Sequence, residues 1–312
     1  MSTQKYIDDE KGWIDSLLAG APIVEGKKVS IEPVIDIDPE IEKEIALIQE
    51  TKFSEKIKSI PGEFVLDQNL ASGAISQVFL CTYNQVQAVI RMDCPSASML
   101  SIDRGSEVKI LNSVKNLELA PKILYQDEPA GILIWEFIPG IKPLFNSSNK
   151  DYCLKSLGRE LSLIHNTAIP DDCLDIFTHS LDLYESLLNN TSDEPLFTKA
   201  LSLFKTLYFD GTPKVLSHND LNPGNLLWEN KFYFLDWEYA SLNHPCFDLA
   251  SLVHHYKLDP AQIHELSIGY GGDQELFAVE RLQHWIEFIL YLDEIWTISV
   301  DVILEQLPDE SD

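Results

Sequence analysis

The sequence has 312 residues, of which 45% are hydrophobic, enough for one large domain or for two lobes with separate cores. Fifty acidic and 23 basic side chains give a formal net charge of −27, which makes nucleic acid and anionic lipid poor partners. This acidity fits attraction of a cationic ligand or solubility alone, and composition does not decide between them. The five cysteines are scattered without a C-x-x-C spacing, which argues against a disulfide framework and a zinc site.

No stretch of the sequence predicts export or a membrane span. Residues 1–10 are charged and polar, without the apolar segment of a signal peptide. The most apolar stretch, 285–296, is interrupted by Glu287, Asp293 and Glu294, so it predicts a core helix. We therefore expect a cytoplasmic protein without a membrane span, while its oligomeric state stays open.

The first part of the chain is predicted to be an extension followed by a sheet lobe. Residues 1–60 are charged, with a helix expected after Pro39, and Pro61-Gly62 predicts a turn that closes this extension. Residues 61–140 are predicted to form an antiparallel sheet with one helix. Its strands are expected near 64–70, 78–80, 87–91, 122–125 and 131–138, and its helix near 102–115.

The second part of the chain, residues 141–312, is predicted to be a helical lobe. Apolar residues recur at helical spacing over 152–166, 181–188 and 196–207, and again from 249 onward. A strand–loop–strand region over 215–240 interrupts the helices. The expected fold class is therefore α+β, with a cleft at the junction of the lobes, where ligand sites tend to lie.

A polar loop between two apolar strands carries the candidate chemistry. The loop presents His218, Asp220 and Asn225, and the strand after it ends in Asp236. Asn and Asp oxygens suit magnesium, and a separate carboxylate can accept the proton of an attacking hydroxyl. These are the parts that phosphoryl transfer requires. The alternative is a polar hairpin whose turn is Asn222-Pro223-Gly224.

The spacing H-N-D-x-x-x-x-N, followed eleven residues later by D-W-E, closely resembles the catalytic and metal-binding loops of kinase-like phosphotransferases. With F-D-L-A downstream, it is similar to the choline kinase, thiamine kinase and aminoglycoside phosphotransferase group. The resemblance implies a bilobal protein-kinase-like fold and an enzyme that uses ATP and Mg2+. It makes Asp220 the catalytic base and His218 the brace of its loop. It assigns Asn225 and Asp236 to magnesium and makes Asp248 a buried structural carboxylate.

Segments of the first lobe resemble the nucleotide-binding parts of the same group. The whole resemblance to this group spans about residues 62–300. Residues 70–79 resemble the phosphate-covering loop with a single glycine, and a plain hairpin bend is the alternative. Arg91 stands where protein kinases place their ATP-binding lysine, and Glu107 is positioned to pair with it. Segment 134–140 resembles the hinge that holds adenine. The nucleotide-binding residues implied are Ser72, Gly73, Ser76, Arg91, Glu107, Glu136 and Ile138.

The substrate implied by the resemblance is a small cationic molecule that bears a hydroxyl group. Trp285 and Phe288 fall where choline kinase relatives place two aromatic residues of the choline pocket, and Glu238 and Tyr239 are further candidates. Aromatic faces and carboxylates suit a quaternary ammonium. The alternative for the aromatic stripe is ordinary helix core.

Choline or ethanolamine is the substrate that the resemblance favours. Thiamine kinase and aminoglycoside phosphotransferase stay open as alternatives within the same group. From another class, the chain could be a non-catalytic kinase-like nucleotide-binding module. The intact Asp220, Asn225 and Asp236 argue against that class, because a pseudokinase commonly loses one of them.

Overall fold

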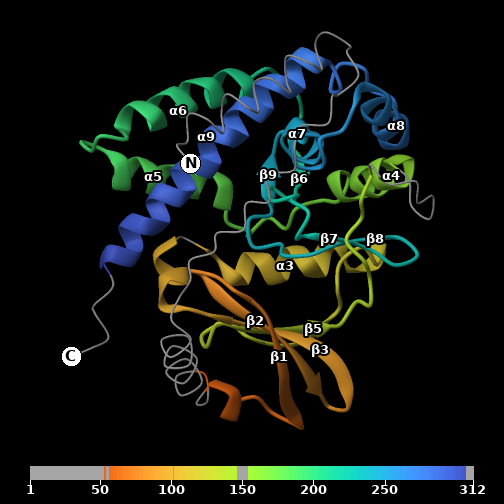
Figure 1. The fold of residues 1–312 in the computed structure, drawn as a ribbon, viewed down its shortest axis with the longest axis vertical. Coiled ribbons are helices and arrows are strands. Elements are labelled where there is room, and N and C mark those ends of the chain that lie inside the picture. Colours follow the sequence, from red (N-terminus) through yellow and green to blue (C-terminus); the bar gives the residue numbers. More distant parts are fainter. Residues whose placement is uncertain (1–52, 54–55, 101, 146–153, 307–312) are drawn as a thin grey trace, which may run out of the picture. The chain divides into compact units, whose positions relative to one another are not determined.

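The computed structural model describes residues 53, 56–100, 102–145 and 154–306 (Figure 1). The helix expected after Pro39 lies outside these residues. The described chain divides into two compact units, of which one holds residues up to Cys94 together with 123–137. The other holds 95–122 and the residues from Ile138 onward. The helix that the sequence assigned to the sheet lobe therefore groups with the helical unit.

The first unit is a five-stranded antiparallel sheet in the order β1-β2-β3-β5-β4. Asn84 and Gln85 both have positive φ, which is the backbone of a two-residue hairpin turn between β2 and β3. One face is covered by apolar side chains that include the fully buried Cys81 and Ile90. The strands are β1 (Phe64–Ser72), β2 (Ser76–Tyr83), β3 (Val86–Asp93), β4 (Ile123–Asp127) and β5 (Ile132–Glu136).

The second unit is mainly helical, as the apolar spacing predicts. The long helix α9 contacts α5, α6 and α7, and Figure 1 shows it running beside α6. None of the helices in the described residues is both long and apolar enough to cross a bilayer. The helices are η1 (Pro95–Leu100), α3 (Arg104–Val114), η2 (Lys115–Leu117), α4 (Leu154–His165), α5 (Ile176–Leu188), α6 (Glu194–Tyr208), α7 (Pro245–Tyr256), α8 (Pro260–Tyr270) and α9 (Val279–Gln306).

Two short antiparallel strand pairs lie within the helical unit and present its polar loops. Strand β6 (Val215–Ser217) pairs with β9 (Ser241–Asn243), and β7 (Leu226–Trp228) pairs with β8 (Phe232–Phe234). The chain between β6 and β7 is the loop 218–225. The chain between β8 and β9 is the segment 235–240. The pairing of β6 with β9 joins the start of the first loop to the end of the second segment.

Helices α4 and α8 cross at two glycines. A Cβ on Gly158 would lie 2.2 Å from the carbonyl oxygen of Leu266, and one on Gly269 would lie 2.1 Å from that of Lys155. Both distances are far inside van der Waals contact, so this close backbone approach requires residues without a side chain.

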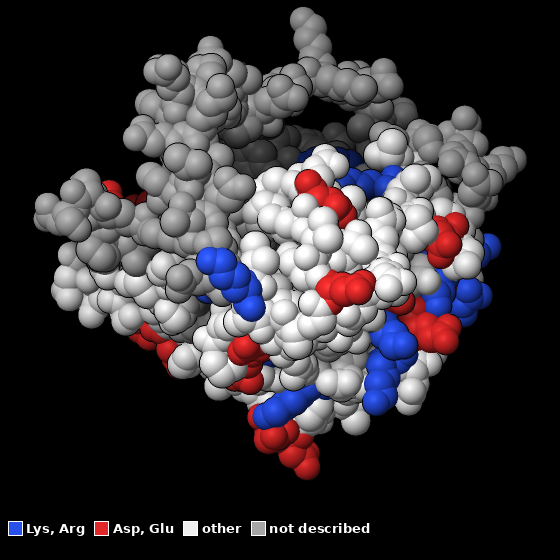
Figure 2. Space-filling model, turned by 90° about the horizontal axis from the view of Figure 1, so that it is seen from below, with Lys and Arg blue, Asp and Glu red and all other residues white. Residues whose placement is uncertain are grey.

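Figure 2 shows one face of the molecule coloured by charge. Acidic and basic side chains are interspersed there among uncharged residues. On that face the excess of acidic residues does not gather into a patch of one sign.

Candidate functional site

The loop 218–225 is anchored on a buried carboxylate at the start of α7. Asp248 accepts hydrogen bonds from the backbone N–H groups of His218, at 2.7 Å, and Asn219, at 2.9 Å. Its side chain is fully buried. The sequence-based interpretation of Asp248 as a structural carboxylate beneath the loop is confirmed.

His165, at the end of α4, is the third partner of Asp248. Its Nε2 lies 3.0 Å from Asp248 Oδ2, and its Nδ1 lies 2.6 Å from the Tyr270 hydroxyl. Because a carboxylate only accepts, Nε2 carries the proton. Burial alone would raise the pKa of Asp248. The pKa is nevertheless held below its usual value, first by the hydrogen bond and charge of His165 and then by the charge and backbone N–H of His218.

His218 joins the loop to the segment after β8. Its Nε2 donates to the carbonyl oxygen of Leu235 at 2.9 Å, and its ring contacts the buried Trp237. Burial lowers the pKa of His218 to about 4, so the ring is neutral at pH 7. This arrangement suits a brace rather than a group that exchanges protons with a substrate.

Asp220 is the partly exposed carboxylate of the loop, held by two amides. Asn222 Nδ2 donates to its Oδ1 at 2.9 Å, and Asn225 Nδ2 donates to its Oδ2 at 2.6 Å. Burial raises the pKa of Asp220 to about 6, and the charge of Glu238 acts in the same direction. The hydrogen bonds from the two side-chain amides lower the pKa of Asp220, but by less than burial raises it. A carboxylate with this pKa is better matched to proton transfer near neutral pH than an ordinary aspartate.

Asn225 and Asp236 are brought close to one another by the backbone. The N–H of Leu235 donates to the carbonyl of Asn225 at 2.8 Å. Asp236 is the residue after Leu235, so this hydrogen bond keeps its backbone near Asn225. Asp236 has φ +60° and an exposed side chain. This left-handed backbone is uncommon outside glycine and persists only when its surroundings hold it.

The donor set of these two residues fits magnesium. Because Asn225 Nδ2 binds Asp220, the carbonyl oxygen Oδ1 is the amide atom that can act as a metal ligand. No cluster of three or more His, Cys, Asp or Glu that could hold a metal occurs in the described residues. Magnesium requires no such cluster, since it commonly takes one or two carboxylates together with waters and phosphate oxygens.

Asn219 is a connecting residue that the sequence analysis did not single out. It has φ +64°, and its Nδ2 donates to the Tyr239 carbonyl at 2.9 Å and to the Ser241 hydroxyl at 3.0 Å. Its Oδ1 accepts from Asn243 Nδ2 at 2.8 Å. Asn219 therefore ties the loop with Asp220 to the segment that contains Asp236. Its tolerance of a left-handed backbone is the only sequence signal for this role.

Arg104, the first residue of α3, is a second residue that sequence reasoning missed. Its Nη1 lies 2.7 Å from Glu238 Oε2 and 3.1 Å from Glu107 Oε2. All three side chains are nearly buried, with exposures of 10% for Arg104, 8% for Glu238 and 2% for Glu107. Glu238, expected to contact substrate, thus takes part in an ion pair with a helix far away in the sequence.

Tyr239 and α9 supply further polar groups beside this segment. Trp296 Nε1 donates to the Tyr239 hydroxyl at 3.0 Å, and both side chains are half-buried. One turn earlier on α9, Asp293 is exposed to solvent. Surrounding protein raises the pKa of Asp293 to about 7, and the charge of Asp220 adds to that shift. Asp293 therefore lies within electrostatic reach of Asp220.

Trp285 and Phe288 do not present a face to solvent in the structure. Both are fully buried. Trp285 packs on His244 and Phe247, and Phe288 stacks on Phe204 with ring centroids 5.2 Å apart. Their positions fit the helix-core alternative for the aromatic stripe, and their assignment to a substrate pocket stays a prediction. They are buried because α9 turns this side toward α6 and α7.

The predicted nucleotide-binding residues are divided between the two units. In the sheet unit, Ser72 and Gly73 lie at the β1–β2 bend, where the Gly73 N–H donates to the Ser76 carbonyl. Arg91 is buried within β3, with Nε 3.7 Å from Asp93. Glu136 ends β5. Glu107 and Ile138 belong to the helical unit, so the pairing of Arg91 with Glu107 stays a prediction.

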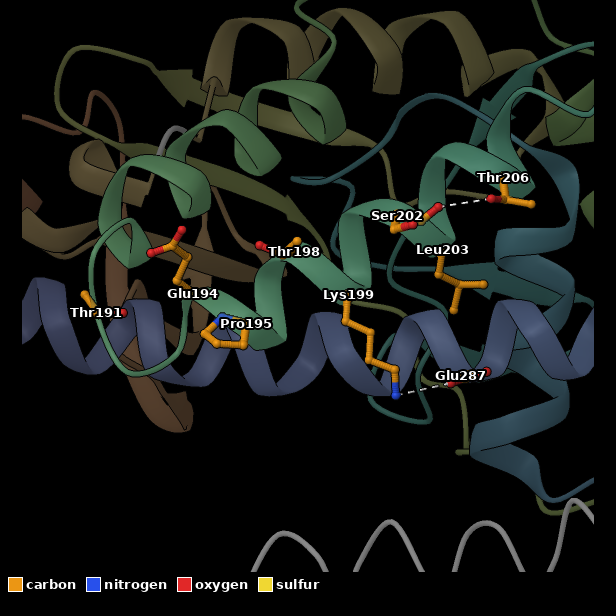
Figure 3. Close-up of a pocket in the computed structure, with 9 residues that line it drawn as sticks. All are labelled: Thr191, Glu194, Pro195, Thr198, Lys199, Ser202, Leu203, Thr206 and Glu287. Atoms are coloured by element: carbon orange, nitrogen blue, oxygen red, sulfur yellow. Dashed lines mark hydrogen bonds and ion pairs between the residues drawn. The ribbon is translucent and has the colours of Figure 1, made fainter.

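A separate hollow of about 770 Å³ lies along α6 and α9 (Figure 3). Lys199 and Glu287 face one another across it, with Nζ and Oε1 3.9 Å apart. Its other lining residues are Thr191, Glu194, Pro195, Thr198, Ser202, Leu203 and Thr206. None of the predicted site residues lines this hollow.

Comparisons with known proteins identify a family and several relatives of this chain. Residues 68–285 match the family described as "Phosphotransferase enzyme family". A Metamycoplasma hominis protein named "Protein LicA homolog" is 29% identical, over 66% of this chain and 86% of that one. An Arabidopsis thaliana protein named "Probable ethanolamine kinase" is 28% identical, over 46% of this chain and 40% of that one.

A similar fold occurs in the crystal structure of choline kinase LicA from Streptococcus pneumoniae. The two structures have a TM-score of 0.63 and 23% identity, over 85% of this chain and 93% of the other. The expected α+β, bilobal, protein-kinase-like fold is therefore confirmed. The family match covers residues 68–285 of the 312 in the chain, which is more than half. The chain belongs to the phosphotransferase enzyme family, and it is a phosphotransferase that acts on hydroxyl groups.

Proposed function

We propose that this protein is an ATP- and Mg2+-dependent kinase of a small cationic alcohol of the choline or ethanolamine class. The observation that carries the proposal is the group of acidic side chains around Asp220, in which Glu238 is paired with Arg104 and Asp293 is exposed. The charges of Glu238 and Asp293 both interact with its carboxylate. A cation beside the reacting hydroxyl would be attracted to such surroundings, whereas an anionic alcohol would be repelled.

In the proposed reaction, Asp220 accepts the proton of the substrate hydroxyl. The hydroxyl oxygen then forms a bond to the γ-phosphorus of ATP as the bond to the bridging oxygen breaks, which releases ADP. The amides of Asn222 and Asn225 hold the Asp220 carboxylate in a fixed orientation for this transfer. His218 stays neutral and braces the loop from beneath.

Asn225 and Asp236 are the residues that would hold magnesium. When bound, this ion would neutralise charge on the transferring phosphate. The candidates for binding the nucleotide stay Ser72, Gly73, Ser76, Arg91, Glu107, Glu136 and Ile138. Arabidopsis and Streptococcus pneumoniae relatives named as ethanolamine and choline kinases support the substrate class.

The substrate contacts that we propose are Glu238, Tyr239, Trp296 and Asp293. Tyr239 and Trp296 offer half-buried aromatic surface, and Asp293 offers an exposed carboxylate on the same side of α9 as Trp296. Carboxylates and aromatic faces both favour an ammonium group. This set differs from the one expected from the sequence, because Trp285 and Phe288 lie in the core.

The test is a comparison of ATP-dependent phosphorylation of choline, ethanolamine, thiamine and an aminoglycoside, with Asp220→Asn as the control. We expect the highest kcat/KM for choline or ethanolamine, and transfer by the control that is lower by about 10²–10⁴-fold. A higher kcat/KM for thiamine or for the aminoglycoside would overturn the proposed choline or ethanolamine substrate class. Binding of ATP without transfer to any of the four would favour the non-catalytic binding module.

A further inference from the structure

Side-chain contacts hold the segment 236–239 in place, and besides the bond from Trp296 Nε1 to the Tyr239 hydroxyl three of them matter here. Trp237 Nε1 donates to the Phe234 carbonyl at 2.8 Å, and Asn219 Nδ2 donates to the Tyr239 carbonyl at 2.9 Å. Both contacts come from the loops themselves. The third, between Arg104 and Glu238 at 2.7 Å, is the one that reaches the segment from helix α3.

The segment requires such anchoring because of its backbone. Asp236 is in the left-handed region, with φ +60°, which costs free energy for a residue that has a Cβ. A side chain two residues further along, fixed by a short ion pair, restricts the positions that Asp236 can take. The contact is nearly buried, so water screens it little.

One guanidinium nitrogen of Arg104, Nη1, lies close to two carboxylates. Nη1 lies 2.7 Å from Glu238 and 3.1 Å from Glu107, which is one turn further along α3. The Asp103 side chain caps the same helix by accepting from the Gly105 N–H at 3.0 Å. The helix start that carries Arg104 is therefore itself fixed.

We propose that Arg104 is a positioning residue of phosphoryl transfer, which joins Glu107 on α3 to Glu238 and thereby holds Asp236 where it can bind the magnesium–nucleotide complex. The proposal rests on the metal role proposed for Asp236. Arg104 itself needs no contact with the nucleotide or the acceptor. It acts through the Glu238 carboxylate.

The experiment compares Arg104→Met, which keeps the aliphatic length, with Arg104→Lys, which keeps the charge. Lys109→Met is the matched control, because it removes a cation from the same helix whose ion pair with Asp172 is exposed. Binding of magnesium–ATP is measured by calorimetry without any acceptor, and folding is monitored by thermal unfolding. The kinetic constants of magnesium-dependent ATP turnover are measured beside them.

We expect Arg104→Met to weaken magnesium–ATP binding by about tenfold or more, because a nearly buried carboxylate loses its cation. Arg104→Lys should recover most of the binding, since it keeps a positive charge beside the carboxylates of Glu107 and Glu238. Lys109→Met should match the unmodified protein.

A double-mutant cycle with Glu238→Gln separates positioning from general structural support. If Arg104 acts through Glu238, the double variant should bind magnesium–ATP no more weakly than the worse single variant. Additive losses, or unchanged binding in folded Arg104→Met, would overturn the proposal. Equal defects in Arg104→Lys and Arg104→Met would do the same.

Two further outcomes keep this test distinct from that of the proposed function. If Arg104→Met does not fold, Arg104→Lys and Glu238→Gln carry the test, and intact binding in Glu238→Gln would refute it. If the unmodified protein binds magnesium–ATP but phosphorylates no amino alcohol, the substrate proposal fails. The test of Arg104 still applies in that case, because the measurement of magnesium–ATP binding uses no acceptor.

Discussion

The carboxylate of Asp248 accepts the backbone N–H of His218 at 2.7 Å, and this contact fixes where the loop 218–225 begins. The same carboxylate takes the Asn219 N–H and the His165 ring. Three donors thus converge on one buried side chain. The position of Asp220, which follows Asn219 directly, depends on this carboxylate.

Asp248→Asn should lower both stability and activity. An amide has one acceptor oxygen, so its NH2 group would face a backbone N–H and leave a buried donor without a partner. We expect the free energy of unfolding at pH 7 to fall by about 3 kcal/mol or more. Urea denaturation measures this loss, and phosphate transfer should fall with it.

Asp301→Asn is the matched control, because Asp301 is exposed on α9. Its replacement should change the free energy of unfolding by no more than about 0.5 kcal/mol. If Asp248→Asn behaved like this control, the carboxylate would not be anchoring the loop.

Asp220→Asn should separate stability from activity. Phosphate transfer should fall by about 10²–10⁴-fold, the usual contribution of a general base. Because burial raises the pKa of Asp220 to about 6, its charged form is disfavoured in the folded protein. Removing that charge should leave the melting temperature at pH 8 unchanged or higher.

Asp220→Glu is the companion variant for that test. It keeps the carboxylate but moves it by one methylene, so the bonds from Asn222 and Asn225 cannot both be retained. We expect slow but measurable transfer. Full activity in Asp220→Asn would exclude Asp220 as the base, whatever the melting temperature.

Asp236→Asn should weaken magnesium-dependent nucleotide binding while keeping the fold. Asn tolerates a left-handed backbone as Asp does, so the φ of +60° can be retained. The substitution removes the negative charge that a divalent cation prefers. Calorimetric titration with ATP, with and without magnesium, should show the loss only when magnesium is present. An equal loss without the metal would point to a direct nucleotide contact instead.

The sequence predicted the parts of the site that lie close together along the chain. Asp220, Asn225 and Asp236 follow one another within a strand–loop–strand region, so their spacing alone indicated one site. Arg104 could not be found this way, because its partner Glu238 is 134 residues away. Only the tertiary fold shows that the start of α3 meets the segment after β8.

The helix α9 shows a second limit of sequence patterns. Its interrupted apolar stretch correctly predicted a core helix, and the strands and helices elsewhere lie close to their expected ranges. Helical spacing cannot tell which aromatic residues face core and which face a ligand, since both give the same period. Trp285 and Phe288 are core, whereas Asp293, whose charge only argued against a membrane span, lies within reach of Asp220.

Gly158→Ala and Gly269→Ala should each destabilise the helical unit. The added methyl groups would meet carbonyl oxygens at 2.2 and 2.1 Å, so α4 and α8 would have to separate. We expect a loss of about 2 kcal/mol or more, as for overpacked cores. Activity should fall too, because Tyr270 follows Gly269 and bonds His165. Arg159→Ala, on the exposed side of α4, is the control and should be near neutral.

Stability should fall as the pH is lowered from about 6.5 to about 4. Burial lowers the pKa of His218, His244 and His255 to about 4 and that of His254 to about 3. In this window the unfolded chain binds these four protons and the folded protein does not, so acid favours unfolding. Asp220 acts in the opposite sense, because burial raises its pKa to about 6.

The histidines outnumber the opposing carboxyl, so near pH 5 the unfolded chain holds roughly three more protons from these five groups, which corresponds to about 4 kcal/mol per pH unit. Urea denaturation at several pH values measures this slope. His254→Gln should reduce the slope by about 1.4 kcal/mol per pH unit, because it removes one of the four neutral rings. A slope that His254→Gln left unchanged would mean that this ring is charged in the folded protein. Stability that increased toward pH 4 would mean that carboxyl groups dominate.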